Sequence, residues 1–281
     1  MQIIETQKEL SDYLSQLSLE NKDVGFVPTM GALHEGHMSL IEKAKAENAI
    51  CICSIFINPI QFNNLEDFTN YPQNLKQDIE KLESVDCDAV FHPSYELMYP
   101  GSLPKPIDLG FLEEGMEGKY RPGHFHGVVA VVSRFFELIS PKRAYFGLKD
   151  YQQYAVVNHM VRVLDFNVGI VGCETIRSEN GLALSSRNQL LSENGGNIAS
   201  IFYSCLQQAR SMYHQNSIAD IKAHVIERFE NTNDCKLEYF EIVDATRLTE
   251  INADSKPEGI VACIAGFVEG VRLIDNLVII P

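Results

Sequence analysis

Short apolar runs alternate with helical patterns along the first 175 residues, and this alternation limits the possible folds more than any other feature. The runs have the length and composition of buried strands, and each is separated from the next by a stretch with helical periodicity. They lie at residues 24–29, 49–57, 88–91, 143–147 and 168–172. Alternation of this kind predicts an α/β fold with a doubly wound, Rossmann-like parallel sheet. Ligands of such sheets bind beyond the carboxyl ends of the strands.

The pattern changes after residue 175. Two helical patterns follow, and then three strand-like runs with no helix between them, the last two joined by Glu269-Gly270 as a hairpin turn. We therefore expect a Rossmann-like domain at 1–175 and a smaller α+β domain with antiparallel strands at 176–281. Residues 93–123 hold five of the eleven prolines, and we expect a long loop there.

Charge and cysteine content exclude several classes of protein. The chain has 23 Lys and Arg against 38 Asp and Glu, a net charge of −15, which disfavours binding to nucleic acid or to an anionic membrane. Seven cysteines without a C-x-x-C pair indicate buried thiols in a reducing compartment. No export signal and no apolar segment of about 18 residues is present, so we expect a soluble cytoplasmic protein.

The segment with the clearest chemistry joins the first predicted strand to a helix. It reads PTMGALHEGH at 28–37, with glycines that permit close backbone approach to a ligand. We expect the helix to begin at about His37, so that its free N–H groups and two imidazoles, His34 and His37, meet phosphate. Zinc is the alternative ligand, but H-E-G-H is not H-E-x-x-H and no third ligand is evident.

A second polar segment, FGLKDYQQ at 146–153, leaves another predicted strand. Lys149 would stand at the carboxyl edge of the sheet, where an ammonium group can meet phosphate oxygens. For Asp150 the alternative is that it has no role in binding and only caps the next helix. Gln153 falls one turn after Lys149, on the same side.

Three weaker features complete the set of candidate residues. The turn Ser185-Ser186-Arg187 offers two hydroxyls and a planar cation, as phosphate-clamping loops do, although serine-rich linkers are common. Asn58 and Gln61 follow a predicted strand, where neutral amides suit a small polar acid. The pair His124 and His126 is interpreted as part of a loop or pocket edge, with metal binding as the alternative.

Together these segments resemble the HIGH-type nucleotidyltransferase superfamily, in which an H-x-G-H turn follows the first strand and a Ser/Lys-rich loop comes later. Three runs narrow the resemblance: VPTMGALHEGH at 27–37, SIFINPIQF at 54–62, and FGLKDYQQ at 146–153 with SSRN at 185–188. Their order and spacing are similar to those of the pantoate–β-alanine ligase family. The similarity covers nearly the whole chain.

The resemblance implies roles for individual residues by matching position. It implies an ATP site formed by Met30, Gly31, Ala32, Leu33, His34, Glu35, Gly36, His37, Gly147, Leu148, Lys149, Asp150, Ile176, Leu184, Ser185, Ser186 and Arg187. It implies catalytic roles for His34, His37, Lys149 and Arg187, with His37 as the proton donor. It implies that the substrates contact Asn58, Gln61, Tyr71, Arg121 and Gln153, with Gln61 also near the entry of β-alanine.

The reaction implied by the resemblance is an ATP-dependent ligation in two steps. The pantoate carboxylate attacks the α-phosphorus of ATP to give pantoyl adenylate and pyrophosphate, and the amine of β-alanine then displaces AMP. Mg²⁺ is implied together with ATP, and Asp78 is a candidate ligand. A homodimer is also implied, and we expect the smaller domain or residues 63–75 to cover the reactive adenylate.

Two departures and three alternatives remain open. Leu148 stands where the family often carries a polar residue, and Leu184 replaces a frequent Met; neither removes a charge that the reaction needs. A related cytidylyl- or adenylyltransferase would share the histidines but not Gln61 and Gln153. A non-catalytic nucleotide-binding protein of the same fold is a second alternative. A truncated tRNA synthetase, the third, is disfavoured by the acidic charge.

Overall fold

The structure is a computed structural model that describes residues 1–64, 68–101, 103–251, 255 and 257–281. The chain forms two compact units. The first comprises Met1–Leu109, Arg121–Leu148 and Gln153–Glu174, and the second comprises Gly110–Tyr120, Lys149–Gln152 and Thr175–Pro281. We expected a single boundary at 175/176. The final boundary lies one residue earlier, between Glu174 and Thr175, and two short segments that precede it in the chain also belong to the second unit.

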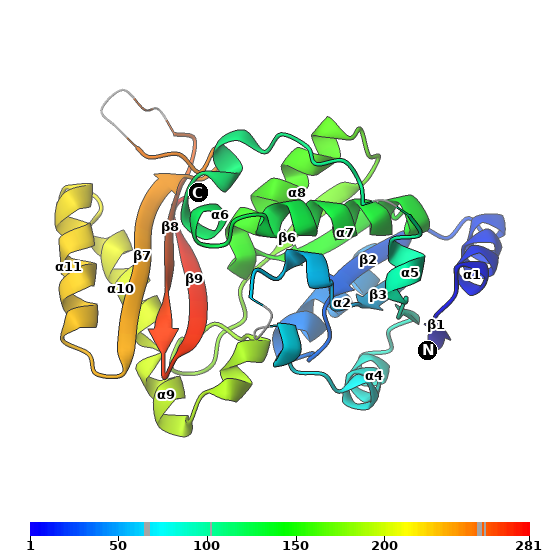
Figure 1. The fold of residues 1–281 in the computed structure, drawn as a ribbon, viewed down its shortest axis with the longest axis horizontal. Helices are drawn as coiled ribbons and strands as arrows, with labels where there is room; N and C mark the ends of the chain where they lie inside the picture. Colours follow the sequence, from blue (N-terminus) through cyan, green and yellow to red (C-terminus); the bar gives the residue numbers. More distant parts are fainter. Residues whose placement is uncertain (65–67, 102, 252–254, 256) are drawn as a thin grey trace. The chain divides into compact units, whose positions relative to one another are not determined.

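The first unit is built on a six-stranded sheet whose described strand pairings are all parallel (Figure 1). In sheet order its strands are β1 (Gln2–Ile4), β4 (Ala89–Phe91), β3 (Ile50–Ile55), β2 (Val24–Thr29), β5 (Arg143–Gly147) and β6 (Gly169–Cys173). This confirms the predicted doubly wound sheet. The five expected strands are present within two residues of their predicted ends. The sequence analysis did not predict β1, in which only Ile4 is buried.

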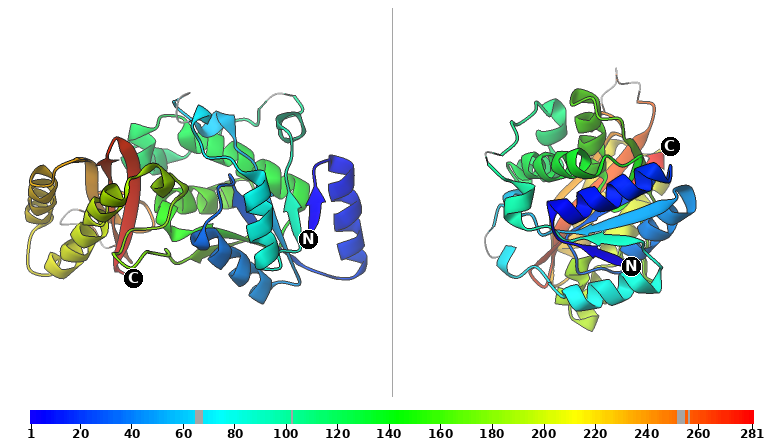
Figure 2. Two further views of the ribbon diagram at one scale, coloured as in Figure 1. Left: turned by 90° about the horizontal axis from the view of Figure 1, so that it is seen from below. Right: turned by 90° about the vertical axis from the view of Figure 1, so that its right-hand side faces the viewer.

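Helices cover both faces of this sheet. The helical segments that lie wholly or mainly in the first unit are α1 (Gln7–Leu19), α2 (Glu35–Glu47), η1 (Pro59–Gln61), α4 (Leu75–Ser84), α5 (Tyr95–Met98), α7 (His124–Ile139) and α8 (Tyr151–Val163). Alternate residues of β2 point to opposite faces: Val27 packs with α2 and α4, whereas the Phe26 ring meets Phe135 of α7 at 5.3 Å. Figure 2 (right) shows the sheet between α7 (green) and α4 (cyan).

The order of the strands reverses between β2 and β5. From β2 the chain builds the sheet outward through β3 and β4, and it then returns to the other side of β2 with β5 and β6. β2 pairs with β3 along its whole length, but with β5 only at Gly25 and Phe26. The last residues of β2 and β5 therefore lie on either side of the switch point, where sheets of this kind bind ligands.

The expectation of a loop without regular structure at 93–123 was wrong in part. The segment contains α5, η2 (Gly110–Glu113) and α6 (Met116–Tyr120). In the second unit, buried Glu117 of α6 accepts hydrogen bonds from Arg272 at 2.6 and 2.9 Å and from the Tyr239 hydroxyl at 2.9 Å. All three helices are short, and α6 is held by partners more than 100 residues away, which local periodicity cannot reveal.

The second unit contains a three-stranded antiparallel sheet in the order β7-β8-β9, as predicted. Its remaining elements are η3 (Leu148–Asp150), η4 (Ser186–Leu190), α9 (Glu193–Ile198), α10 (Ile201–Met212), α11 (Ile218–Glu230), β7 (Cys235–Asp244), β8 (Ile260–Val268) and β9 (Val271–Ile280), with η3 beginning at the end of the first unit. Glu269 and Gly270 join β8 to β9 with φ angles of 51° and 79°. Two positive φ angles in succession are typical of a type I′ hairpin turn, so the predicted turn is confirmed.

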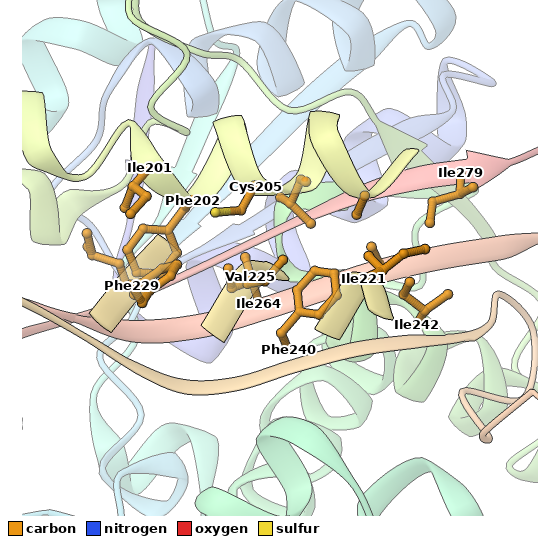
Figure 3. Packing of buried hydrophobic residues seen from close by; sticks show 14 of the residues in the cluster. Ile201, Phe202, Cys205, Ile221, Val225, Phe229, Phe240, Ile242, Ile264 and Ile279 are labelled. Atoms are coloured by element: carbon orange, nitrogen blue, oxygen red, sulfur yellow. The ribbon is translucent and has the colours of Figure 1, made fainter. Parts of the chain in front are cut away.

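Two helices and this sheet enclose the core of the second unit. α10 packs on β8 and β9, and α11 packs on β7. Figure 3 shows Phe202 of α10 against Phe229 of α11, with Ile264 of β8 beside them. The two phenyl rings meet edge to face, with centroids 5.3 Å apart. The unit therefore has an apolar core of its own.

All seven cysteines are free thiols, and six of them are buried, as the sequence analysis expected. Cys51 and Cys53 of β3 share the face that packs under α2. Within the described residues, no helix is both long enough and apolar enough to cross a membrane.

Candidate nucleotide and acid site

The turn between β2 and α2 holds both predicted histidines. His34 is the N-cap of α2, and the helix begins at Glu35, two residues earlier than expected. The His34 ring replaces the usual Ser or Asp as cap, because its Nδ1 accepts a hydrogen bond from the N–H of Gly36 at 3.1 Å. The rings of His34 and His37 lie together, with centroids 4.1 Å apart.

The hydrogen bonds of the two rings assign their protons. Nδ1 of His34 accepts from one backbone N–H, and Nδ1 of His37 accepts from the N–H of His34 itself at 3.3 Å. A backbone N–H can only donate, so each Nδ1 is unprotonated and each neutral ring carries its proton on Nε2. Both imidazoles therefore act as Nε2 donors beside the positive end of a 13-residue helix.

Asp78 of α4 anchors the loop that precedes the histidines. Its Oδ2 accepts from the N–H of Ala32 at 2.9 Å, and its Oδ1 accepts from the N–H of Leu33 at 2.7 Å. A side chain at Gly31, where φ is +79°, would come within 2.9 Å of that carboxylate. Lys81 fixes the same loop by donating to the carbonyl oxygen of Leu33. The Asp78 carboxylate thus shapes the loop, a role that the sequence analysis did not foresee.

A buried amide pair follows β3. Asn58 caps η1 and donates through Nδ2 to Oε1 of Gln61 at 3.1 Å. The Gln61 Nε2 donates in turn to Sδ of Met30 at 3.0 Å, which links η1 to the residue directly after β2. The structure thus brings together three of the predicted contact residues.

Two further predicted residues contact neighbours of Gln61. Arg121 is 3.1 Å from Nε2 of His124, whose Nδ1 donates to the carbonyl oxygen of Gln61 at 2.7 Å. The Tyr71 ring packs edge to face on Phe62 at 5.8 Å. The interpretation of His124 as a loop residue was wrong, because it is the first residue of α7 and is buried.

Gly147 is the last residue of β5, and Lys149 follows two residues later. Leu148 packs against the backbone of β6, where a side chain on Gly172 would come within 2.8 Å of its Cδ2. In the second unit, the carbonyl oxygen of Lys149 accepts from Nδ2 of Asn276 at 2.7 Å. The Lys149 side chain is 16% exposed and lies 4.0 Å from Asp150. Asp150 directly precedes α8, and its capping role stays a prediction.

The loop that leads to the serine turn is held by the same strand, β9. Arg177 makes a bidentate ion pair with Asp275, at 2.6 and 2.9 Å. Its guanidinium carbon lies over the Tyr203 ring, 3.9 Å from the ring centre. Burial raises the pKa of the Asp275 carboxyl, and the hydrogen bonds and charge of Arg177 oppose that rise. Asp275 and Asn276, adjacent in sequence, therefore anchor the Arg177 loop and the Lys149 backbone respectively.

The serine turn itself is a short 3-10 helix. It begins with a capping box formed by the side chains of Ser185 and Asn188. Oγ of Ser185 accepts a hydrogen bond from the N–H of Arg187, and Oδ1 of Asn188 accepts one from the N–H of Ser185. Before it, the N–H of Leu184 donates to the carbonyl oxygen of Ile176 at 2.9 Å. Two of the residues expected at the nucleotide site, Ile176 and Leu184, are thereby adjacent.

The predicted residues thus form two groups, one in each unit. The first unit holds the histidine turn, Gly147, Leu148 and the amide pair, and Gln153 of α8 lies in the same unit. The second unit holds Lys149, Asp150, Ile176 and the serine turn. No group of three His, Cys, Asp or Glu side chains that could hold a metal ion occurs among the described residues.

The sequence analysis missed three residues that organise these groups, Tyr99, Asp275 and Asn276, and it gave Asp78 and His124 other roles. One signal was present in the sequence. The run Val271–Ile280 is apolar apart from a few positions, and two neighbouring polar residues in its middle, Asp275 and Asn276, are both buried. Buried polar groups need partners, so such a pair indicates an anchoring role.

Comparison with known proteins gives a consistent result. The sequence model of the family described as pantoate-beta-alanine ligase matches residues 2–278. A pantothenate synthetase of Cytophaga hutchinsonii is 46% identical over 275 residues, which is 97% of either chain. That of Bacteroides thetaiotaomicron is 42% identical over 281 residues, covering 99% of this chain and 98% of the relative.

Solved structures agree over the full length. A crystal structure of pantothenate synthetase from Thermus thermophilus has a TM-score of 0.91 and 40% identity, with both chains fully covered. The enzyme of Francisella tularensis, described in complex with beta-gamma ATP and beta-alanine, has a TM-score of 0.81 and 35% identity over 99% of this chain and 98% of that one. On its sequence and its fold, this chain belongs to the pantoate–β-alanine ligase family.

Proposed function

We propose that this protein joins pantoate to β-alanine at the expense of ATP, through a pantoyl-adenylate intermediate. The observation that carries the proposal is that the histidine turn directly follows β2, and that β5, on the other side of the switch point in the same sheet, ends at Gly147. Lys149 follows Gly147 by two residues, a span of at most about 7 Å of extended chain. The family and the ligands described for the Francisella relative support the same reaction.

The first step forms one bond and breaks one. An oxygen of the pantoate carboxylate attacks the α-phosphorus of ATP, and the bond from that phosphorus to the bridging oxygen of pyrophosphate breaks. Since two anions meet, the site must offset negative charge that grows at the phosphoryl oxygens. We assign this task to the Nε2 donors of His34 and His37, to the N-terminus of α2, and to Lys149 and Arg187.

The second step transfers the acyl group. The amine nitrogen of β-alanine attacks the activated carbonyl carbon, the bond from that carbon to the AMP oxygen breaks, and the nitrogen loses a proton. AMP is a far better leaving group than oxide, which is why the carboxylate is adenylated first. His37 is proposed as the group that donates a hydrogen bond to the departing oxygen in the first step and so stabilises its negative charge, because its N–H is fixed on Nε2.

The acid substrate is assigned to the first unit. Gln61 offers a neutral amide group, Arg121 supplies a cation for the carboxylate, and Tyr71 and Gln153 are proposed as further contacts. Asn58, expected to contact the substrate, has a fully buried amide whose N–H groups and oxygen already have partners within the protein, so it supports Gln61 instead. Gln61 is also proposed to lie where β-alanine enters.

Mg²⁺ is proposed as the partner of ATP, although the described residues do not form a dedicated site for it. The one buried carboxylate suggested as a ligand, that of Asp78, already accepts two backbone hydrogen bonds. Magnesium is often held mainly by substrate phosphates and water, so no step above relies on a protein-bound ion. The homodimer remains a prediction, which sedimentation of the purified protein would test.

A substrate-omission assay tests the proposed function. The purified protein is incubated with Mg-ATP, pantoate and β-alanine, and AMP, pyrophosphate and pantothenate are measured together. We expect equal amounts of the three products, and pyrophosphate release that requires pantoate but not β-alanine in the first turnover. A product that retained the nucleotide would indicate a different nucleotidyltransferase, and ATP binding without turnover would indicate a non-catalytic protein.

A further inference from the structure

The orientation of the Asn58 carboxamide is fixed by partners that allow only one assignment. Its Nδ2 lies 3.0 Å from the carbonyl oxygen of Gly127, which can only accept. Its Oδ1 lies 3.4 Å from the N–H of Ile60, which can only donate. The two ends of this fully buried amide therefore cannot be exchanged.

This assignment passes to Gln61. The second N–H of the Asn58 amide donates to Oε1 of Gln61 at 3.1 Å, so the Gln61 oxygen faces Asn58 and its Nε2 faces the other way. There Nε2 meets the thioether of Met30 at 3.0 Å, and thioether sulfur is a weak acceptor. The Gln61 backbone is fixed as well. Its carbonyl oxygen accepts from His124, and α7 passes so close that a side chain on Gly127 would come within 2.6 Å of the Gln61 Cα.

Tyr99 completes the chain of hydrogen bonds at the Asn58 end. Its hydroxyl lies 3.1 Å from Oδ1 of Asn58 and must donate, because that oxygen has no proton to give. The ring is 6% exposed and packs against Phe56 and Tyr95, with centroids at 6.4 and 5.1 Å. Burial raises the pKa of Tyr99, so the phenol stays protonated and remains a donor at any pH at which the protein works.

We propose that Tyr99 is a positioning residue for the acid substrate: acting through Asn58, it holds the Gln61 carboxamide so that Nε2 donors, and not the oxygen, face the ligand. This inference rests on the proposed function. A carboxylate oxygen of the acid, which can only accept, then meets N–H groups, whereas a reversed Gln61 would present a lone pair to it and repel it. The arrangement selects a ligand with an acceptor oxygen at this point.

The test compares two tyrosine-to-phenylalanine variants that differ by one hydrogen bond. Tyr99→Phe removes the donor, and Tyr95→Phe is the matched control, because Tyr95 packs against the Tyr99 ring at a tilt but is itself 43% exposed. Loss of one buried hydrogen bond corresponds to roughly a 5- to 20-fold change in an equilibrium. We expect the KM for pantoate to rise by about this factor in Tyr99→Phe, with kcat at saturating pantoate and the KM for ATP changed less than twofold. Tyr95→Phe should match the wild type in all three.

A purely structural role would change kcat and both KM values together, and that outcome would overturn the proposal, as would an unchanged KM for pantoate. A second readout does not depend on the reaction. In NMR spectra of the wild type, the side-chain N–H₂ protons of Asn58 should exchange slowly with solvent, and this protection should fall at least tenfold in Tyr99→Phe but not in Tyr95→Phe. Equal protection in all three proteins would refute the positioning role of Tyr99, even if the enzyme made no pantothenate. If the wild type made no pantothenate, that result would refute only the proposed function.

Discussion

The carboxylate of Asp78 is expected to hold the nucleotide loop in shape, and Asp78→Asn tests this with almost no change in volume. The carboxylate accepts from two backbone N–H groups, those of Ala32 and Leu33. An amide keeps one acceptor and turns an N–H₂ group toward the other backbone N–H. Loss of one charge-assisted hydrogen bond at a buried group costs about 1.5–3 kcal/mol. For a domain of this size, that corresponds to a fall of roughly 3–12 °C in melting temperature.

The assay is thermal unfolding without metal or nucleotide, followed by steady-state kinetics. Asp86→Asn is the control, since Asp86 carries the same substitution on an exposed side chain. The KM for ATP should rise in Asp78→Asn because Ala32, at φ 50°, and the histidines that follow depend on this anchor. If Asp78 instead served mainly as a magnesium ligand, the metal-free melting temperature would not move and only the Mg²⁺ dependence of the rate would change. That result would refute the anchoring role.

Three more expectations follow from the structure. His37→Ala and Lys149→Ala should each slow single-turnover adenylation by at least about 10²-fold in a quench-flow assay, and near-normal rates would refute their roles. Arg177→Ala leaves the Asp275 carboxylate buried without its partner, so urea unfolding of the second unit should show a loss of about 3–5 kcal/mol, a deficit that shrinks as falling pH protonates the acid. Burial raises the pKa of the Cys205 thiol to about 11 from 9.0, so above pH 9 ionisation favours the unfolded chain; between pH 8 and 10 the wild type should lose about 1 kcal/mol more stability than Cys205→Ala.

The parallel sheet could be predicted because its inner strands are short, apolar and buried on both faces. β3 illustrates this, since all six of its residues are buried and its largely apolar sequence predicts a strand covered on both faces. β1 was not predicted, because an edge strand of three residues with one buried side chain has no periodic hydrophobic pattern. α6 escaped because Glu117, which holds it, is paired with residues 122 and 155 positions away.

The same contrast applies to the site. The place of the histidine turn after β2 and of Gly147 at the end of β5 could be predicted because each belongs to the end of a strand, and parallel strands bring their carboxyl ends to one edge. The anchors could not, because each contact spans a long stretch of chain: 46 residues from Asp78 to Ala32, 41 from Tyr99 to Asn58 and 98 from Arg177 to Asp275. The start of α2 also differs from the predicted one, because His34 occupies the N-cap position, where Ser or Asp is more usual.

The most direct test of the proposed chemistry follows the pantoate oxygen. Pantoate labelled with ¹⁸O in its carboxylate is converted with Mg-ATP and β-alanine, and the products are analysed by mass spectrometry. Attack on the α-phosphorus predicts one ¹⁸O in each AMP and none in pyrophosphate. Label found in inorganic phosphate, with ADP as the other product, would mean that the terminal phosphoryl group was attacked and would contradict the adenylation mechanism.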